Sequence, residues 1–252
     1  MNDTKLLTGR RALVTGAASG IGAAIAVAFA AAGARVSLVD KVGGDRLAEV
    51  AHRCAEAGAE VVTAVADVSE EAEVQAAFET TMDTFGGLDV LVNNAGIITE
   101  SRVEDMPVAL LDQMLAVNLR SVFLCCRAAL PAMRAQRYGR IINISSQLAL
   151  KGAPLIAHYC AAKAGVLGLT KALAREVAAD GITVNAIAPG PVETRLAEGM
   201  SDAAKAKKDA LPLGRFGQAE EIAPTAVLLA GDPGGNLYTG QTLGPNSGDV
   251  MP

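Results

Sequence analysis

Short apolar runs alternate along this chain with longer segments whose apolar residues recur at helical spacing. Apolar runs bounded by polar or turn residues are typical of strands that are buried on both faces of a sheet. Strands are predicted at residues 11–15, 34–39, 60–65, 88–92, 139–144 and 182–187. Because helical segments separate them, the pattern predicts an α/β fold with a doubly wound parallel sheet and helices on both faces. A ligand crevice is then expected at the carboxyl ends of the strands.

The chain is 252 residues long, and no linker, repeat or low-complexity segment divides it. We therefore expect residues 1–252 to form one domain. The alternation is broken before a helix predicted at 219–230, where prolines and glycines flank a short helical segment. This position favours a mobile substrate lid at about residues 190–215. We interpret the lysines of this segment as a solvated surface, in preference to a phosphate clamp; they are Lys205, Lys207 and Lys208.

Composition excludes several classes of protein. The chain is 51% hydrophobic and 19% charged with a net charge of −5, and its scattered basic residues argue against nucleic acid as a partner. No stretch approaches the roughly 18 uninterrupted apolar residues of a membrane span, and the polar start lacks the pattern of a secretion signal. The four cysteines lack the spacing of a metal site and are expected to be reduced and mostly buried. We expect a soluble, cytoplasmic protein without a metal or a membrane partner.

A glycine-rich turn joins the first predicted strand to the helix that follows it. Glycines stand at positions 16, 20 and 22, and the helix predicted from Ile21 to Ala32 ends at Gly33. Glycines permit a sharp turn and leave the first N–H groups of the helix open to a pyrophosphate. Three glycines often mark only a turn, but the strand–turn–helix context favours a dinucleotide site.

Acidic residues follow the second and third strands. Asp40 lies about twenty residues beyond the glycine turn, where a carboxylate accepts hydrogen bonds from the adenosine ribose. A carboxylate at 4 Å would repel the extra phosphate of NADP by about 4 kcal/mol per unit charge, which favours NAD, although Lys41 could offset part of this. The alternative for Asp40 is a simple strand-end turn. Asp67, followed by Val68, is predicted to meet the adenine amino group, with a helix cap near Ser69 as the alternative.

The fourth strand ends in the small or polar residues Asn93, Asn94, Ala95 and Gly96. The small residues let the backbone approach a ligand closely, and the amide side chains can join neighbouring strands. We prefer Asn93 over Asn94 for a role beside the cofactor, in addition to a structural role.

Tyr159 and Lys163 lie four positions apart in a helix predicted over 158–178, so both side chains project from one face. A free tyrosine has a pKa near 10 and is only about 0.1% ionised at neutral pH. Lys163 and a positively charged nicotinamide ring are expected to lower this pKa, which would make Tyr159 an acid–base catalyst. Ser146, at the end of the fifth strand, offers a hydroxyl to the substrate oxygen, and the Asn118 side chain could join a proton relay through water.

Simpler explanations exist for these polar residues. A Tyr–Lys pair at this spacing is commonly a surface contact, but its place after a strand-end serine and a glycine turn favours catalysis. His158 invites a triad with a serine, yet the chain contains no Gly-x-Ser-x-Gly elbow, so we interpret it as a packing or pocket residue.

As a set, these residues resemble the short-chain dehydrogenase/reductase family in its widespread single-domain form. The resemblance spans essentially the whole chain and includes the stretch from Asn185 to Thr194. It implies a Rossmann fold with a seven-stranded sheet whose last strand lies near 241–244. It also implies a homotetramer built on long helices at 119–137 and 158–178.

The resemblance further implies a role for each residue. Tyr159 would be the catalytic acid/base, and Ser146 would orient the substrate. Lys163 would bind the nicotinamide ribose and tune Tyr159, and Asn118 would complete the proton relay. Thr194 and the neighbouring backbone would contact the nicotinamide carboxamide. The residues expected to bind the cofactor are Gly16, Ser19, Gly20, Ile21, Gly22, Asp40, Asp67, Val68, Asn93, Ala95, Gly96, Tyr159, Lys163, Pro189, Gly190, Val192 and Thr194.

Two details of the family pattern concern Ser146 and Ser247. Ser146 is chosen over Ser145 because the family places its serine thirteen residues before the tyrosine. The chain departs from the pattern at Ser247, where many relatives have a second glycine, so the packing of the C-terminal segment is left open.

These observations predict an NAD-dependent oxidoreductase that interconverts a secondary alcohol and its ketone by hydride transfer. The alternative in the same class is an NADPH-dependent keto reductase, for instance of 3-oxoacyl thioesters, and a different class is an NAD-binding sensor without turnover. The mainly apolar wall at 147–156, with Ile97 and Ile98, indicates an uncharged or amphipathic substrate. Arg102 or Arg195 would instead pair with an anionic group, and the alternative for both is a side chain that points to solvent.

Overall fold

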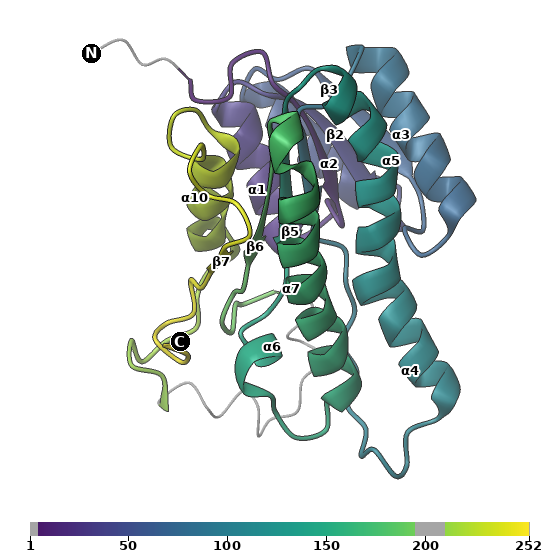
Figure 1. Ribbon diagram of the computed structural model, residues 1–252, viewed down its shortest axis with the longest axis vertical. Helices are drawn as coiled ribbons and strands as arrows, with labels where there is room; N and C mark the ends of the chain where they lie inside the picture. The colour runs from purple at the N-terminus through teal and green to yellow at the C-terminus, as the bar shows by residue number, and fades with distance from the viewer. Residues whose placement is uncertain (1–4, 195–209, 252) are drawn as a thin grey trace.

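Seven parallel strands form one sheet in the computed structural model, which describes residues 5–194 and 210–251 (Figure 1). The order across the sheet is β3-β2-β1-β4-β5-β6-β7. The strands are β1 (Arg11–Thr15), β2 (Arg35–Asp40), β3 (Val61–Val65), β4 (Val90–Asn93), β5 (Gly139–Ile144), β6 (Ile182–Ile187) and β7 (Thr242–Leu243). Each predicted strand is present with ends shifted by at most two residues, so the predicted Rossmann-like α/β fold is confirmed.

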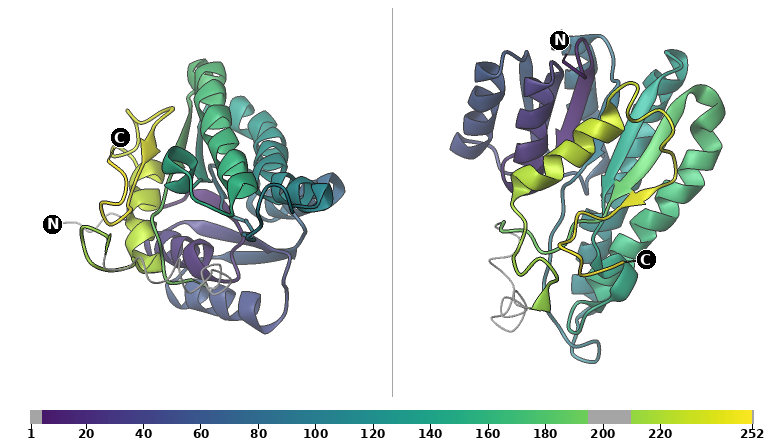
Figure 2. Two further views of the ribbon diagram at one scale, coloured as in Figure 1. Left: turned by 90° about the horizontal axis from the view of Figure 1, so that it is seen from below. Right: turned by 90° about the vertical axis from the view of Figure 1, so that its left-hand side faces the viewer.

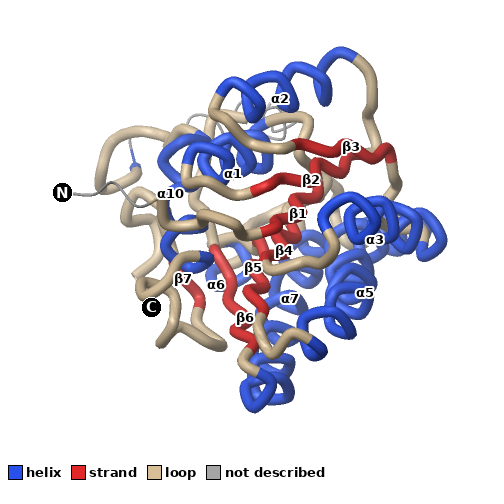
Figure 3. The backbone as a smooth tube through the Cα atoms, turned by 90° about the horizontal axis from the view of Figure 1, so that it is seen from above, coloured by secondary structure: helices blue, strands red, loops and turns tan. Residues whose placement is uncertain are grey.

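Helices cover both faces of the sheet (Figure 3). Along β1, Ala12 and Val14 belong to the core on the side of α1, α2 and α10, whereas Leu13 belongs to the core on the opposite side. This alternation explains why the strands read as continuous apolar runs. The helices of the first face are α1 (Gly20–Ala31), α2 (Asp45–Glu56) and α10 (Ala219–Ala230), and those of the second are α3 (Glu71–Phe85), α5 (Ser121–Ala135) and α7 (Ala157–Val177).

The order of the strands reverses at β1, which pairs with β2 on one side and with β4 on the other. The connections leaving β1 and β4 therefore run to opposite sides, and a crevice opens between their carboxyl ends. The glycine turn follows β1 and the Asn93–Gly96 segment follows β4, so the topology brings these two predicted ligand segments together.

The long helix predicted over 119–137 begins earlier and contains an irregular turn. Helix α4 (Val108–Leu115) continues into the π-helical turn η1 (Ala116–Arg120) and then into α5. An 18-residue window of this 28-residue path has a mean hydropathy of 1.5, so the helix is long and apolar enough to cross a membrane. Helices of soluble proteins pass the same test, and α5 places Val122, Cys125 and Met133 in the core of the second face. We assign it as a helix that packs on the sheet with one face and leaves the rest of its surface uncovered, since 33% of the window is buried. The sequence analysis found no stretch of membrane-spanning length because it counted only uninterrupted apolar runs.

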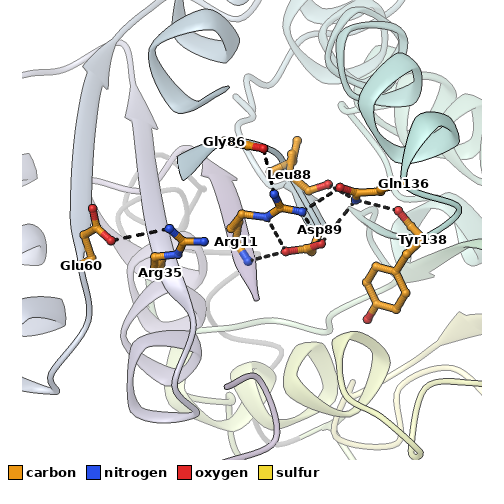
Figure 4. Close-up of polar contacts among 8 residues, drawn as sticks. All are labelled: Arg11, Arg35, Glu60, Gly86, Leu88, Asp89, Gln136 and Tyr138. Atoms are coloured by element: carbon orange, nitrogen blue, oxygen red, sulfur yellow. Dashed lines mark hydrogen bonds and ion pairs between the residues drawn. The ribbon is translucent and has the colours of Figure 1, made fainter. Parts of the chain in front are cut away.

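A polar network joins the strands at their amino ends, opposite the crevice (Figure 4). The guanidinium of Arg11 donates to both carboxylate oxygens of Asp89, at 2.7 and 2.8 Å, and the Arg11 backbone N–H donates to Oδ2 at 2.8 Å. Gln136, at the end of α5, accepts from Arg11 at 2.7 Å and donates to the Leu88 carbonyl. These bidentate, charge-assisted bonds hold the starts of β1 and β4 in register.

A short helix and a 3₁₀ turn are also present in the part of the chain that the structure describes. Helix α6 (Leu148–Lys151) lies between β5 and α7, and the 3₁₀ turn η2 (Ala178–Asp180) precedes β6. The part of the predicted lid at 195–209, with Arg195 and the three lysines, lies outside the described residues. The two flanking segments meet at a bridge between Val192 and Gly217.

Candidate functional site

A cavity of ≈ 1020 Å³ lies at the carboxyl ends of the strands. Its volume is at the upper limit of ordinary ligand pockets, which leaves room for a large ligand or for two. The turn after β1, the strand ends of β2 and β4, and the segment after β6 line one part. Residues 97–100, the α6 region and the end of the chain line the other part.

The glycine turn has the backbone of a phosphate cradle. Gly16 and Gly20 have φ of 64° and 56°, a conformation that favours glycine. A Cβ on Gly22 would lie 2.2 Å from the Gly16 carbonyl oxygen, so the helix start packs directly on the turn. No side chain caps the first turn of α1, and Ser19, Gly20 and Ile21 line the cavity. These residues fit the pyrophosphate of a dinucleotide.

Asp40 is held rigidly at the end of β2. Its Oδ2 accepts a hydrogen bond from the Ala18 N–H at 2.9 Å, and its Oδ1 accepts one from the Val42 N–H at 2.8 Å. The carboxylate is thereby tied to the glycine turn, and it lines the cavity. Each oxygen keeps a second lone pair for a ligand hydroxyl. Asp40 is thus both a strand-end turn residue and an acceptor that faces the ligand site.

Asp67 is engaged by the protein itself. Lys41 Nζ lies 2.5 Å from its Oδ2, and the Ser69 hydroxyl donates to its Oδ1 at 2.6 Å. Burial opposes ionisation of Asp67, but these partners more than offset it and hold the carboxyl pKa at about 2. The charge of Lys41 is therefore paired with Asp67.

The predicted catalytic side chains meet on the other side of the crevice. Lys163 Nζ donates to the Ile144 carbonyl at 2.9 Å and lies 5.8 Å from the centroid of the Tyr159 ring. Ser146 and Tyr159 both line the cavity, and the Ser146 hydroxyl acts to lower the pKa of Tyr159. Ser145 instead donates to the Lys163 carbonyl at 2.8 Å, which fastens α7 to β5. This arrangement favours Ser146, since the Ser145 hydroxyl donates to the backbone.

Without the nicotinamide ring the net shift of the Tyr159 pKa is upward, so the expected lowering by Lys163 and that ring stays a prediction. Burial raises the phenol pKa to about 12, against the opposing effect of the Ser146 hydroxyl. Burial also lowers the pKa of the Lys163 ammonium to about 8. Both shifts arise because a low-dielectric environment disfavours the charged form of each group. Ionisation of Tyr159 therefore depends on additional positive charge in the cavity.

Asn118 lies in the π turn and is fully buried. Its Nδ2 donates to the Ile97 carbonyl at 3.0 Å, and its Oδ1 accepts from the Ile97 N–H at 3.3 Å. A Cβ on Gly96 would lie 2.7 Å from Oδ1, which explains the glycine there. π turns of this kind are frequent at functional sites. The side chain fixes the segment after β4, so Oδ1 is the atom that remains for the predicted relay.

Comparison with known proteins identifies this arrangement. A family model described as enoyl-(acyl carrier protein) reductase matches residues 16–248. The chain belongs to the short-chain dehydrogenase/reductase family. It is 42% identical over 245 residues to a 3-oxoacyl-[acyl-carrier-protein] reductase of Synechocystis sp., covering 97% of this chain and 98% of that protein. The crystal structure of levodione reductase has a TM-score of 0.92 with 37% identity, and covers 96% of this chain and 98% of that one. A short-chain type dehydrogenase/reductase from Mycobacterium marinum has a TM-score of 0.93 with 34% identity and 99% coverage of both chains. Membership in the family implies an oxidoreductase with a nicotinamide cofactor.

Nearly all residues predicted from the family pattern line the cavity, and two do not. Gly22 packs beneath the glycine turn, as described above. Asn93 points away, because its Nδ2 donates to Asn143 on β5 at 2.9 Å and to the Cys126 sulfur. Asn94 lines the cavity and donates to the carbonyls of Thr15 and Gly16 at 3.0 Å. We therefore reassign the position beside the cofactor to Asn94, since only one of two consecutive side chains faces each side of the sheet.

Other polar residues named from the sequence lie outside the cavity. His158 is buried, and its Nε2 lies 2.8 Å from the Thr99 hydroxyl, in agreement with a packing role. Arg102 is exposed and pairs with Glu104, so it is not an anion partner inside the cavity. Sequence reasoning missed the C-terminal residue Asp249, which lines the cavity beside Lys151. No local signal marks this contact, because the two residues are far apart in the chain.

Proposed function

We propose that this protein is an NAD-dependent oxidoreductase that interconverts a secondary alcohol and its ketone by hydride transfer. The observation that carries the choice of NAD is the Asp40 carboxylate, which the backbone amides of Ala18 and Val42 hold at the ribose end of the cavity. The Ser146, Tyr159 and Lys163 side chains at the other end support the alcohol and ketone chemistry.

In the proposed reaction the bound nicotinamide supplies the acceptor or donor of the hydride. The protein manages the proton and the geometry. The hydroxyl of Ser146 holds the substrate oxygen, and Tyr159 Oη takes the alcohol proton during oxidation or returns it during reduction. Lys163 uses one N–H on the Ile144 carbonyl, and its remaining donors would bind the nicotinamide ribose.

Cofactor choice gives a direct prediction for Asp40. Asp40→Ala should lower the ratio of kcat/KM for NAD to that for NADP at least about tenfold, because a repulsion worth roughly 4 kcal/mol per charge at 4 Å is removed. Steady-state kinetics with both cofactors and one saturating substrate measure this ratio. Asp45→Ala is the matched control, since Asp45 is an exposed acid at the start of α2 outside the cavity. An unchanged ratio in Asp40→Ala would contradict the role of Asp40.

A second candidate is the NADPH-dependent reduction of 3-oxoacyl thioesters. It is favoured by relatives that are 3-oxoacyl-[acyl-carrier-protein] reductases, such as that of Synechocystis sp.. The same Ser–Tyr–Lys group would serve both reactions. The two are separated by assaying NADH formation on a panel of secondary alcohols and NADPH oxidation on 3-oxoacyl thioesters. Turnover of thioesters only with NADPH would overturn the main proposal, and turnover of alcohols with NAD would support it.

We also propose that the protein works in the cytoplasm as a homotetramer. An apolar groove between the α4–α5 path and α7, lined by Leu115, Leu119, Phe123 and Leu169 among others, supports association through these helices. Phe123 is 48% exposed in the single chain. Light scattering coupled to gel filtration should give a mass near four times 25.6 kDa. Phe123→Asp should lower that mass, because association would bury the new carboxylate without a partner, and a monomeric wild-type protein would contradict the proposal.

A further inference from the structure

After β7 the chain folds back on itself (Figure 2), and Asp249 near its end lines the cavity. The Gly190 N–H donates to the Pro245 carbonyl at 3.0 Å, and the Leu213 N–H donates to the Ser247 carbonyl at 3.2 Å. The loops that contain Gly190 and Leu213 are therefore both hydrogen bonded to this segment. Ser247, which departs from the family's glycine, adopts the left-handed conformation with a φ of 57° all the same.

Asn246 shapes the turn that presents the next residues. Its Oδ1 accepts from the Gly248 N–H at 3.0 Å, and its Nδ2 donates to the Val250 carbonyl at 2.8 Å. Asn246 is itself buried, at 8% exposure. Asp249 is thus held in a fixed position within this turn, and it lines the cavity.

The Asp249 carboxylate meets two side chains of the α6 region. The Gln147 amide donates to its Oδ2 at 2.6 Å, and Lys151 Nζ forms an ion pair with the same oxygen. Within the described ranges Oδ1 has no partner. The Asp249 side chain is 23% exposed and that of Lys151 is 36% exposed, so both remain accessible from the cavity. Gln147 is buried, and its amide holds the Asp249 carboxylate in place.

The pair offers one free acceptor and further donors at one place. The carboxylate has lone pairs on Oδ1, and the ammonium has two N–H groups besides the one that faces Asp249. The charges of Asp249 and Lys151 cancel, so the ion pair would not attract an anion strongly. A neutral hydroxyl, which both donates and accepts, matches these groups. The same cavity has apolar lining residues that include Leu148 and Leu155.

The position of the pair sets its distance from the reacting carbon. Ser146 lies just before α6 and Lys151 lies at its end, and the four residues of this helix rise roughly 6 Å. A substrate held by Ser146 and Tyr159 would reach the pair with a group several bonds away.

We propose that Asp249 and Lys151 determine substrate specificity by binding a second hydroxyl, several bonds from the reacting carbon, of an otherwise apolar and uncharged secondary alcohol or ketone. Gln147 is a positioning residue that holds Asp249. The inference rests on the proposed alcohol and ketone chemistry and adds the class of substrate.

Three substrates with the same six-carbon chain test the assignment: 2-hexanol, 1,5-hexanediol and the anion 5-hydroxyhexanoate, each assayed for kcat/KM with NAD and with NADP. The wild-type protein should prefer the diol over 2-hexanol by about tenfold, as expected for a hydrogen bond to a charged group. It should disfavour the anion. A wild-type protein without preference for the diol would overturn the assignment.

Asp249→Asn removes the negative charge and keeps the shape of the side chain. It should reduce the preference for the diol to about threefold or less and raise the relative kcat/KM for 5-hydroxyhexanoate by about fivefold, because Lys151 then lacks its counter-charge. Asp83→Asn, the same change on the exposed surface of α3, is the control. Unchanged ratios in Asp249→Asn would overturn the role of the pair. Turnover of none of the three alcohols by the wild-type protein would contradict the proposed function itself.

Discussion

Replacement of Tyr159 by phenylalanine is expected to lower kcat by roughly 10³-fold on every alcohol that the wild-type protein oxidises. The ring would stay in its buried place between Ser146 and Lys163, and only the group that exchanges the proton would be lost. Affinity for NADH should change less than about threefold, since the proposed dinucleotide contacts lie mainly on other residues. Stopped-flow turnover and fluorescence titration with NADH measure the two effects separately.

Tyr138→Phe provides the matched control for this experiment. Tyr138 lies near the Arg11 network at the amino ends of the strands, and its hydroxyl has no hydrogen-bond partner among the described residues (Figure 4). This variant should keep the wild-type kcat. A Tyr159→Phe enzyme with wild-type turnover would contradict the assignment of the acid–base group, whereas a loss in both variants would point to a general effect on folding.

The behaviour of Tyr159 shows how far the site depends on its ligand. Its phenol pKa is raised to about 12 by burial, so the protein alone keeps the group protonated at neutral pH. Lys163, whose own pKa falls to about 8, is a weaker source of charge than its spacing from the tyrosine indicates. A dinucleotide with a positive nicotinamide ring would favour the phenolate. We infer that Tyr159 can accept a proton from an alcohol mainly when the oxidised cofactor is bound, whereas the protonated phenol is the form needed for reduction.

The strands of the sheet could be predicted from the sequence because the apolar run that marks each strand is a local pattern. The inner strands β1, β2, β4, β5 and β6 are apolar runs that are almost wholly buried, and their boundaries follow from where each run stops. The three side chains chosen for catalysis line one cavity, since Tyr159 and Lys163 are four positions apart on α7 and Ser146 lies two residues beyond the end of β5. Helical spacing and strand ends are sufficient to bring such groups to the same edge of a sheet.

Side-chain direction and distant contacts could not be predicted in the same way. Asn93 and Asn94 are chemically identical, and only the register of β4 decides that Asn94 faces the cavity. The π turn at Asn118 arises from packing against the segment after β4 and has no local marker. Asp249 reaches Lys151 across 98 positions of the chain through the folding of the C-terminal segment.

Gly22→Ala is the second change with a large expected effect, and here the effect is on stability. A Cβ at this position would lie 2.2 Å from the Gly16 carbonyl oxygen and 2.4 Å from the Asn94 amide nitrogen. The first of these is a backbone atom of the glycine turn, so the clash cannot be relieved by rotating a side chain. We expect a loss of about 3 kcal/mol or more in the free energy of unfolding. Urea denaturation should show a lower midpoint at an unchanged slope.

Gly217→Ala separates this clash from the general effect of adding a methyl group. Its Cβ would make only ordinary contacts, the nearest at 3.7 Å to Val192, and Gly217 has no positive φ. At such a position alanine restricts the unfolded chain, so stability should stay equal or rise by up to about 1 kcal/mol. Because the clash at Gly22 displaces the turn that would hold the pyrophosphate, Gly22→Ala should also weaken NADH binding in the fraction that folds. A Gly22→Ala protein with the wild-type midpoint and affinity would show that the turn is more adaptable than its packing indicates.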